Sequence, residues 1–121
     1  MQQLVALLAD LAGEDLHGLT DAETLERTAT LVAVGNMVAA ELTRTVRHGQ
    51  LTQAPERDGL KSMRSWLIGH ARVSVAEASK LVRAGRVVEH FPDVAAGFAA
   101  GDISAAQVDV CLLYTSPSPR D

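Results

Sequence analysis

The sequence predicts an all-α protein: a helical bundle with one long helix and a helix-turn-helix-like pair. Alanine occurs 19 times in 121 residues and aromatic residues make up only 3%, which favours closely packed helices over sheets. Three Ser or Thr residues are each followed three positions later by Glu or Gln, the spacing of a helix capping box. These pairs are Thr20 with Glu23, Ser74 with Glu77, and Ser104 with Gln107. No segment shows the alternation expected of a strand.

The first capping box opens a long helix, predicted over about residues 21–48 and closed by Gly49. A short apolar helix over residues 3–12, ended by Gly13, precedes it. In the long helix, apolar residues recur every seven positions and mark one core-facing stripe. They are Leu25, Val32, Ala39 and Val46. The same repeat could form a dimer seam, but Gly35 and Asn36 make a weak coiled-coil seam, so a bundle helix is favoured.

Four shorter helices are predicted in the second half of the chain. A polar connection over residues 50–59, containing Pro55 and Gly59, separates them from the long helix and is the best candidate for a mobile loop. Pro92 can end one helix and begin the next. The predicted helices cover about 62–70 and 75–90 (the helix-turn-helix-like pair), 93–100, and Ser104 to about Val110.

The apolar faces of these helices predict the core. Trp66 shares a helical face with Met63 and is its largest member. If Trp66 is fully buried, Trp66→Ala should cost about 3–5 kcal/mol of stability. The predicted core residues are Leu25, Val32, Ala39, Leu42, Val46, Trp66, Leu67, Leu81, Val88, Phe91 and Phe98.

Composition narrows the possible functions. No apolar run is long enough to span a membrane, and no secretory signal is recognised, so we expect a cytoplasmic protein with no membrane partner. The single cysteine, Cys111, excludes a disulfide framework and a cysteine-rich zinc site. The formal net charge of −4 argues against a surface that binds nucleic acid everywhere, but it allows a local basic patch.

Charge is divided unevenly along the chain. Residues 1–59 hold four basic and nine acidic side chains, whereas residues 61–86 hold six basic side chains and one acidic side chain. The helix predicted over 75–90 places Lys80, Arg83 and Arg86 on one side, with Arg72 just before it. These four residues are candidates for contacts with DNA. A solvated basic face of a bundle helix is the alternative, and both interpretations stay open.

No catalytic site is predicted in these residues. The sequence contains no nucleophile–base pair, phosphate loop or metal-ligand spacing. Its histidines show no ligand constellation, and Glu23, Glu77 and Gln107 have the spacing of capping residues. We therefore assign no catalytic or metal-binding residue and expect no cofactor here. The four histidines are His17, His48, His70 and His90.

The stretch from Asp58 to Val110 resembles the actinobacterial 13E12 repeat family, also called domain of unknown function 222. The resemblance rests on Asp58-Gly59, Ser65-Trp66-Leu67, Ser74–Ala78, Phe91-Pro92 and Gly101–Val108. It implies the N-terminal accessory domain of an HNH endonuclease or mobile-element protein. The basic stretch over residues 61–86 makes DNA the candidate partner. The resemblance also implies that a divalent metal would be bound by an HNH module and not by this helical domain. The residues of this sequence do not match an HNH module. The alternative function is a non-enzymatic helical module for protein interaction or self-association.

Residues 111–121 differ in character from the residues before them. They contain the only Cys, the only Tyr and two of the four prolines. The segment resembles a translated sequencing-library adaptor, so we expect a non-native tail that follows a single helical domain over residues 1–110. A genuine Pro/Ser-rich linker is the alternative. The nucleotide sequence would distinguish the two.

Overall fold

A computed structural model describes residues 1–115 of the chain, with side chains through Cys111. The chain divides into two compact units, one ending at Leu31 and the other beginning at Val32. The described residues form six α-helices and two short 3-10 helices, with no strand among them. The predicted all-α class is therefore confirmed. No helix in the described part of the chain is both long and apolar enough to cross a membrane.

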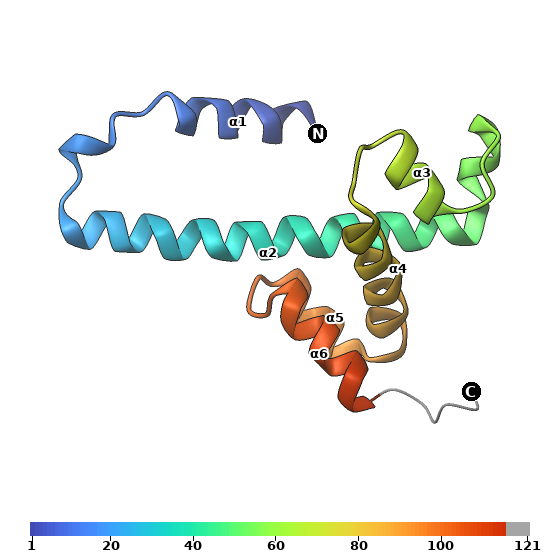
Figure 1. Ribbon diagram of the computed structural model, residues 1–121. Helices are drawn as coiled ribbons and strands as arrows, with labels where there is room; N and C mark the ends of the chain where they lie inside the picture. The colour runs from blue at the N-terminus through green and yellow to red at the C-terminus, as the bar shows by residue number, and fades with distance from the viewer. Residues whose placement is uncertain (116–121) are drawn as a thin grey trace. The chain divides into compact units, whose positions relative to one another are not determined.

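The first unit contains α1 (Gln2–Ala12), the 3-10 helix η1 (Leu16–Gly18) and the beginning of α2 (Asp21–Thr52), as Figure 1 shows. The predicted capping box at the start of α2 is formed in both directions. The Thr20 amide donates to Glu23 Oε1 at 2.9 Å, and the Glu23 amide donates to Thr20 Oγ1 at 3.1 Å. The hydrogen bond from the Thr20 amide stabilises the Glu23 carboxylate and lowers the pKa of Glu23.

From Val32 onward, α2 belongs to the second unit, and it continues beyond the predicted end at Gly49 to Thr52. Gly49 is buried, and a Cβ at this position would lie 2.7 Å from Met63 Sδ. The glycine therefore allows a close approach of α3 and does not end the helix. The connection predicted over residues 50–59 is also more regular than expected, because Ala54–Asp58 forms the 3-10 helix η2.

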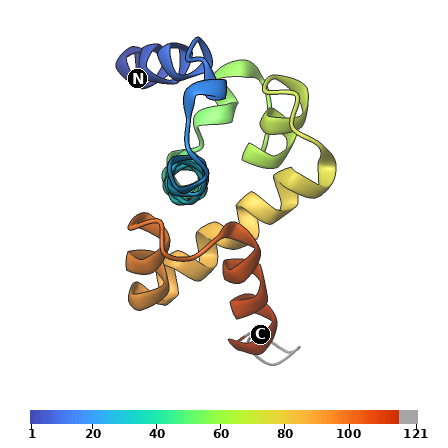
Figure 2. The ribbon, with the colours of Figure 1, turned by 90° about the vertical axis from the view of Figure 1, so that its left-hand side faces the viewer.

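Four more helices complete the second unit: α3 (Met63–Gly69), α4 (Val75–His90), α5 (Pro92–Ala99) and α6 (Ala105–Thr115). Figure 2 shows α4 running between α3 at its start and the α5–α6 pair at its end. The last helix extends past the predicted end at Val110. The prediction of a non-native tail falls mostly outside the described residues and stays a prediction.

Two apolar clusters lie along α4. Near its start, Val46 of α2 and Leu67 of α3 pack with Ala78. Near its end, Phe98 of α5 and Val108 of α6 pack with residues of α4, and α2 contributes Ala39 and Ala40 at the edge. The members from α4 in the second cluster are Ala84 and Val87.

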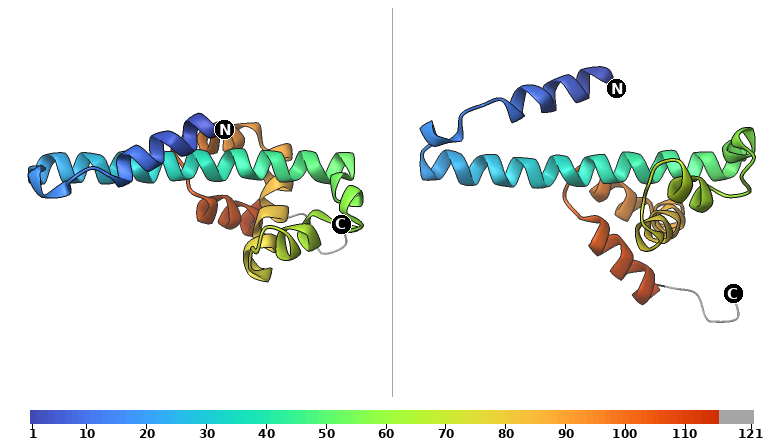
Figure 3. Two further views of the ribbon diagram at one scale, coloured as in Figure 1. Left: turned by 90° about the horizontal axis from the view of Figure 1, so that it is seen from above. Right: turned by 45° about the horizontal axis from the view of Figure 1, so that its top comes forward.

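The helices α2 and α4 contact one another closely in the second unit (Figure 3). Gly85 of α4 is buried, and a Cβ there would lie 3.2 Å from Arg47 Cβ. One turn further on, the Arg47 guanidinium donates to the Glu89 carboxylate and lowers the pKa of Glu89. Gly85 therefore allows the close approach of α2 and α4, and the Arg47–Glu89 ion pair stabilises it.

The predicted core is partly correct. Val46, Leu67 and Phe98 are buried, whereas Leu25, Val32 and Leu42 are 70%, 61% and 43% exposed, so these three predictions are wrong. The stripe of apolar residues spaced by seven continues along α2, but no residue of α2 before Thr43 is buried. Other helices pack densely against the stripe only in the last part of α2. The other five predicted residues are half-buried at the edges of the two clusters. They are Ala39, Trp66, Leu81, Val88 and Phe91.

Candidate nucleic-acid interface

The basic side chains of α4 lie along one side of the helix. Ser74 begins the helix by accepting a hydrogen bond from the Glu77 amide at 3.1 Å. Residues three apart are separated by 300° around a helix, so Lys80, Arg83 and Arg86 lie within about 120° of one another. Lys80 and Arg86 are exposed and Arg83 is half-buried. The predicted clustering of these three residues on one side is therefore consistent with the helix geometry.

The three cations differ in their partners. Lys80 lies 3.9 Å from Glu77 Oε1, and both side chains are more than half exposed. Arg83 Nη2 lies 3.3 Å from Asp109 Oδ1 of α6. Among the described residues, Arg86 has no ion pair or side-chain hydrogen bond. Water screens such exposed pairs, so Lys80 and Arg86 in particular are available to an external anion.

A fourth cation reaches this side from α3. Arg64 Nε donates a hydrogen bond to Ser79 Oγ at 3.1 Å. Ser79 lies between Arg83 and Arg86 around the helix. The contact joins residues 15 positions apart in sequence. We define the basic face as Arg64, Ser79, Lys80, Arg83 and Arg86.

Arg72 lies in the turn between α3 and α4, not on α4. Its φ of 58° is in the left-handed region, although the residue is not glycine. The Val73 amide closes the turn by donating to the Leu67 carbonyl at 3.0 Å. Arg72 is exposed there, so it lies at the entry to α4 and is not part of the basic face.

Sequence reasoning identified the cations of α4 but missed two contacts. The Arg64–Ser79 hydrogen bond and the Arg83–Asp109 ion pair join residues from different helices. The only available signal for the first was that Arg64 belongs to the basic stretch over residues 61–86. Nothing in the local sequence indicated that α6 would bring a carboxylate to Arg83.

The histidines do not build a metal site in the described part of the chain. No group of three or more His, Cys, Asp or Glu residues gathers there in a way that could hold an ion. The His70 ring stacks on the Trp66 indole with a centroid separation of 5.5 Å. The indole Nε1 donates to Asp58 Oδ2 at 2.8 Å. These contacts support the α3 region structurally.

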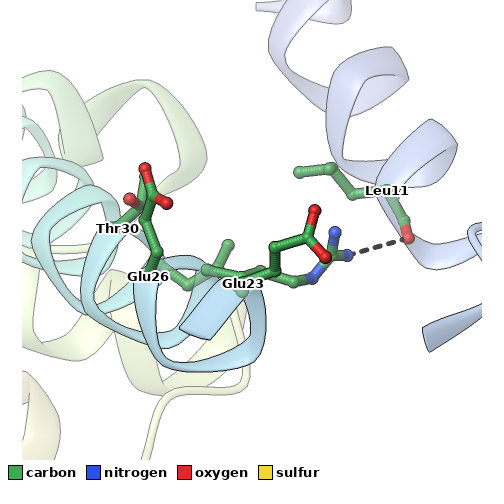
Figure 4. Close-up of a pocket in the computed structure, with 6 residues that line it drawn as sticks. Leu11, Glu23, Glu26 and Thr30 are labelled. Atoms are coloured by element: carbon green, nitrogen blue, oxygen red, sulfur yellow. Dashed lines mark hydrogen bonds between the residues drawn. The ribbon is translucent and has the colours of Figure 1, made fainter. Parts of the chain in front are cut away.

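Two clefts are the other candidates for a site. One, of about 340 Å³, lies in the first unit and is lined by Leu11 together with residues of α2, as Figure 4 shows. The other, of about 440 Å³, lies between the end of α2, η2 and α3, where His48 and Asp58 are on its wall. Neither gathers the convergent polar groups that mark a ligand or active site.

The comparisons with known proteins identify one family. Its sequence model, described as "Domain of unknown function (DUF222)", matches residues 19–120. No curated protein matches the chain, and no solved structure matches it. The matched region includes α2 through α6 and therefore the whole basic face.

Proposed function

Since the chain belongs to the DUF222 family, whose description states no function, we propose that this domain associates with DNA through its basic face. The observation that carries the proposal is that Arg64 of α3 contacts Ser79 on the side of α4 that carries Lys80, Arg83 and Arg86. Clustered Lys and Arg side chains on one side of a domain are the electrostatic footprint of nucleic-acid binding.

The basic face carries the groups that bind phosphates. Arg and Lys bind phosphate oxygens through charge-assisted hydrogen bonds, and a hydroxyl such as that of Ser79 can donate to the same group. Asn and Gln, which recognise adenine in the major groove, are absent from the α4 sequence. We therefore propose binding with little sequence preference and a strong dependence on salt.

The resemblance to the 13E12 repeat family supports a finer proposal, that the domain assists an HNH endonuclease. An HNH module uses histidines and a divalent ion to cleave a phosphodiester. The residues described here do not fit such a metal site, because no suitable cluster of ligands is present among them. We therefore propose DNA association as the role of the described residues within such a protein.

The proposal is tested by comparing two double variants in a DNA-binding titration. Lys80→Gln with Arg86→Gln removes two exposed charges from the basic face, and Arg44→Gln with Arg57→Gln removes two exposed charges elsewhere. Fluorescence anisotropy with a labelled duplex is measured at several salt concentrations. The first variant should bind more weakly, and its slope of log affinity against log salt should be shallower by about two.

The control variant should retain nearly the wild-type slope. Equal slopes for the two variants would show that net charge, not the basic face, governs binding. Absence of binding by the wild-type chain at low salt would refute the proposed function.

A further inference from the structure

The side of α4 that carries the basic face continues to the last residue of the helix. Ser79, Arg83, Arg86 and His90 follow spacings of four, three and four residues, which align side chains along one side of a helix. With about 100° per residue, His90 lies between Arg83 and Arg86 around the helix axis. His90 is the last residue of α4 and is exposed. It therefore extends the basic face by one helical turn beyond Arg86.

Among the described residues, the His90 ring has no ion pair, side-chain hydrogen bond or ring stack. The carboxylate next to it in sequence, Glu89, accepts a hydrogen bond from the Arg47 guanidinium of α2. Arg47 lowers the pKa of Glu89, and His90 does so to a smaller extent. Glu89 therefore has Arg47 as its hydrogen-bonded partner and interacts with His90 through charge alone.

Charged groups also come from the other helices that contact α4. Asp93 is exposed in the first turn of α5, three residues after His90. Asp109 of α6 is already in an ion pair with the basic face. Arg64 of α3 contacts Ser79, which is about 16 Å from His90 along the helix axis. None of these groups forms an ion pair with His90, so its ring is available to an external phosphate.

Unlike Lys and Arg, histidine ordinarily changes its charge between about pH 5 and about pH 8. The protonated ring is positively charged and donates from both nitrogens, so it can bind a phosphate oxygen as Lys and Arg do. The helix dipole, which is negative at the C-terminus, also favours a positive charge at this end of α4. The position of His90 therefore suits a cation whose charge depends on pH.

We propose that protonated His90 is a further phosphate contact of the basic face, so that this domain binds DNA more tightly at about pH 5.5 than at about pH 8. The inference rests on the proposed DNA binding and adds a residue and a pH dependence to it. A phosphate beside the ring stabilises the charged form of the ring, so binding takes up a proton. By linkage, the affinity rises as the pH falls, and the gain is lost as the pH rises.

The test measures the DNA affinity of the full chain by fluorescence anisotropy with a labelled duplex, at about pH 5.5 and about pH 8 and at several salt concentrations. The wild type should bind about three- to fivefold more tightly at the lower pH, the gain expected of one exposed ion pair. Its slope of log affinity against log salt should also steepen by about one, because one more phosphate is neutralised. His90→Gln should lose both changes.

Two further variants separate a phosphate contact from a structural role. His48→Gln is the matched control, because His48 is an exposed histidine of α2 outside the basic face, and it should keep the wild-type pH dependence. His90→Arg fixes the charge, so it should bind at both pH values with the affinity that the wild type has at the lower one. A histidine that only stabilised the end of α4 would change the stability of the helix without changing the salt slope.

The outcomes distinguish this inference from the proposed function. A wild-type affinity that is the same at the two pH values would overturn the inference and leave the proposed DNA binding intact. A gain at low pH that His90→Gln retains, or that His48→Gln also loses, would do the same. Absence of wild-type binding at both pH values in low salt would refute the proposed function and the inference with it.

Discussion

At the scale of single residues, Gly101 is the position that the fold constrains most clearly. Its φ of 85° lies in the region that glycine adopts without strain. A Cβ there would lie 2.8 Å from the carbonyl oxygen of Ala33, a backbone atom that cannot rotate away. The Gly101 carbonyl also accepts a hydrogen bond from Asn36 Nδ2 at 3.2 Å. Gly101 therefore lets the α5–α6 turn rest directly on α2.

We predict that Gly101→Ala destabilises the protein by about 2–4 kcal/mol, because backbone strain and a steric clash act together. Gly35→Ala is the control, since Gly35 is in a helix and a Cβ there meets nothing within 4 Å. That change should stabilise the protein by about 0.5–1 kcal/mol. Urea unfolding measures both. Equal effects of the two changes would contradict this account of Gly101.

At the scale of helices, α4 combines a structural and a functional role. One part of its surface packs against α2, α3, α5 and α6, and the other carries the basic face. The packing against α6 places Asp109 beside Arg83. One carboxylate therefore competes with an external phosphate for this guanidinium.

We predict that Asp109→Asn increases DNA affinity about two- to fivefold, because it releases Arg83 from a partly exposed ion pair worth up to about 1 kcal/mol. Asp93→Asn, at an exposed position of α5, removes the same charge without touching Arg83 and is the control. Titrations at one low salt concentration compare the two. An equal gain for both variants would mean that Arg83 itself does not contact DNA.

At the scale of the whole molecule, the buried apolar core belongs to the second unit. Its residues lie between Val46 and Val108, in two clusters along α4. Phe98 is 1% exposed and is the largest fully buried side chain, whereas Trp66 is half-buried and its indole donates to Asp58. The stability of the described fold should therefore depend more on Phe98 than on the larger Trp66.

We predict that Phe98→Ala lowers the free energy of unfolding by about 3–5 kcal/mol. Trp66→Ala should cost less, because Trp66 is only partly buried at the edge of its cluster. Chemical denaturation of both variants measures the two losses. The comparison requires that the slope of unfolding free energy against denaturant concentration is similar in the two variants. A larger loss for Trp66→Ala would mean that the cluster around α3 dominates stability.

The sequence alone determined the local structure of this protein well. The boundaries of α4 match the prediction, and Ser104 and Gln107 exchange hydrogen bonds of 2.8 and 3.2 Å as the capping-box spacing indicated. These features depend on neighbours within one helical turn, so local spacing suffices to predict them. The grouping of Lys80, Arg83 and Arg86 on one side of a helix was predictable for the same reason.

Only the tertiary structure decided which parts of those helices are covered. The seven-residue stripe of α2 predicted equal burial of Leu25 and Val46, yet one is 70% exposed and the other 2%. The partners of Arg64 and Arg83 likewise come from other helices. Periodicity specifies the direction in which a side chain points, but burial and pairing depend on where another helix lies, and that position follows from packing over the whole chain.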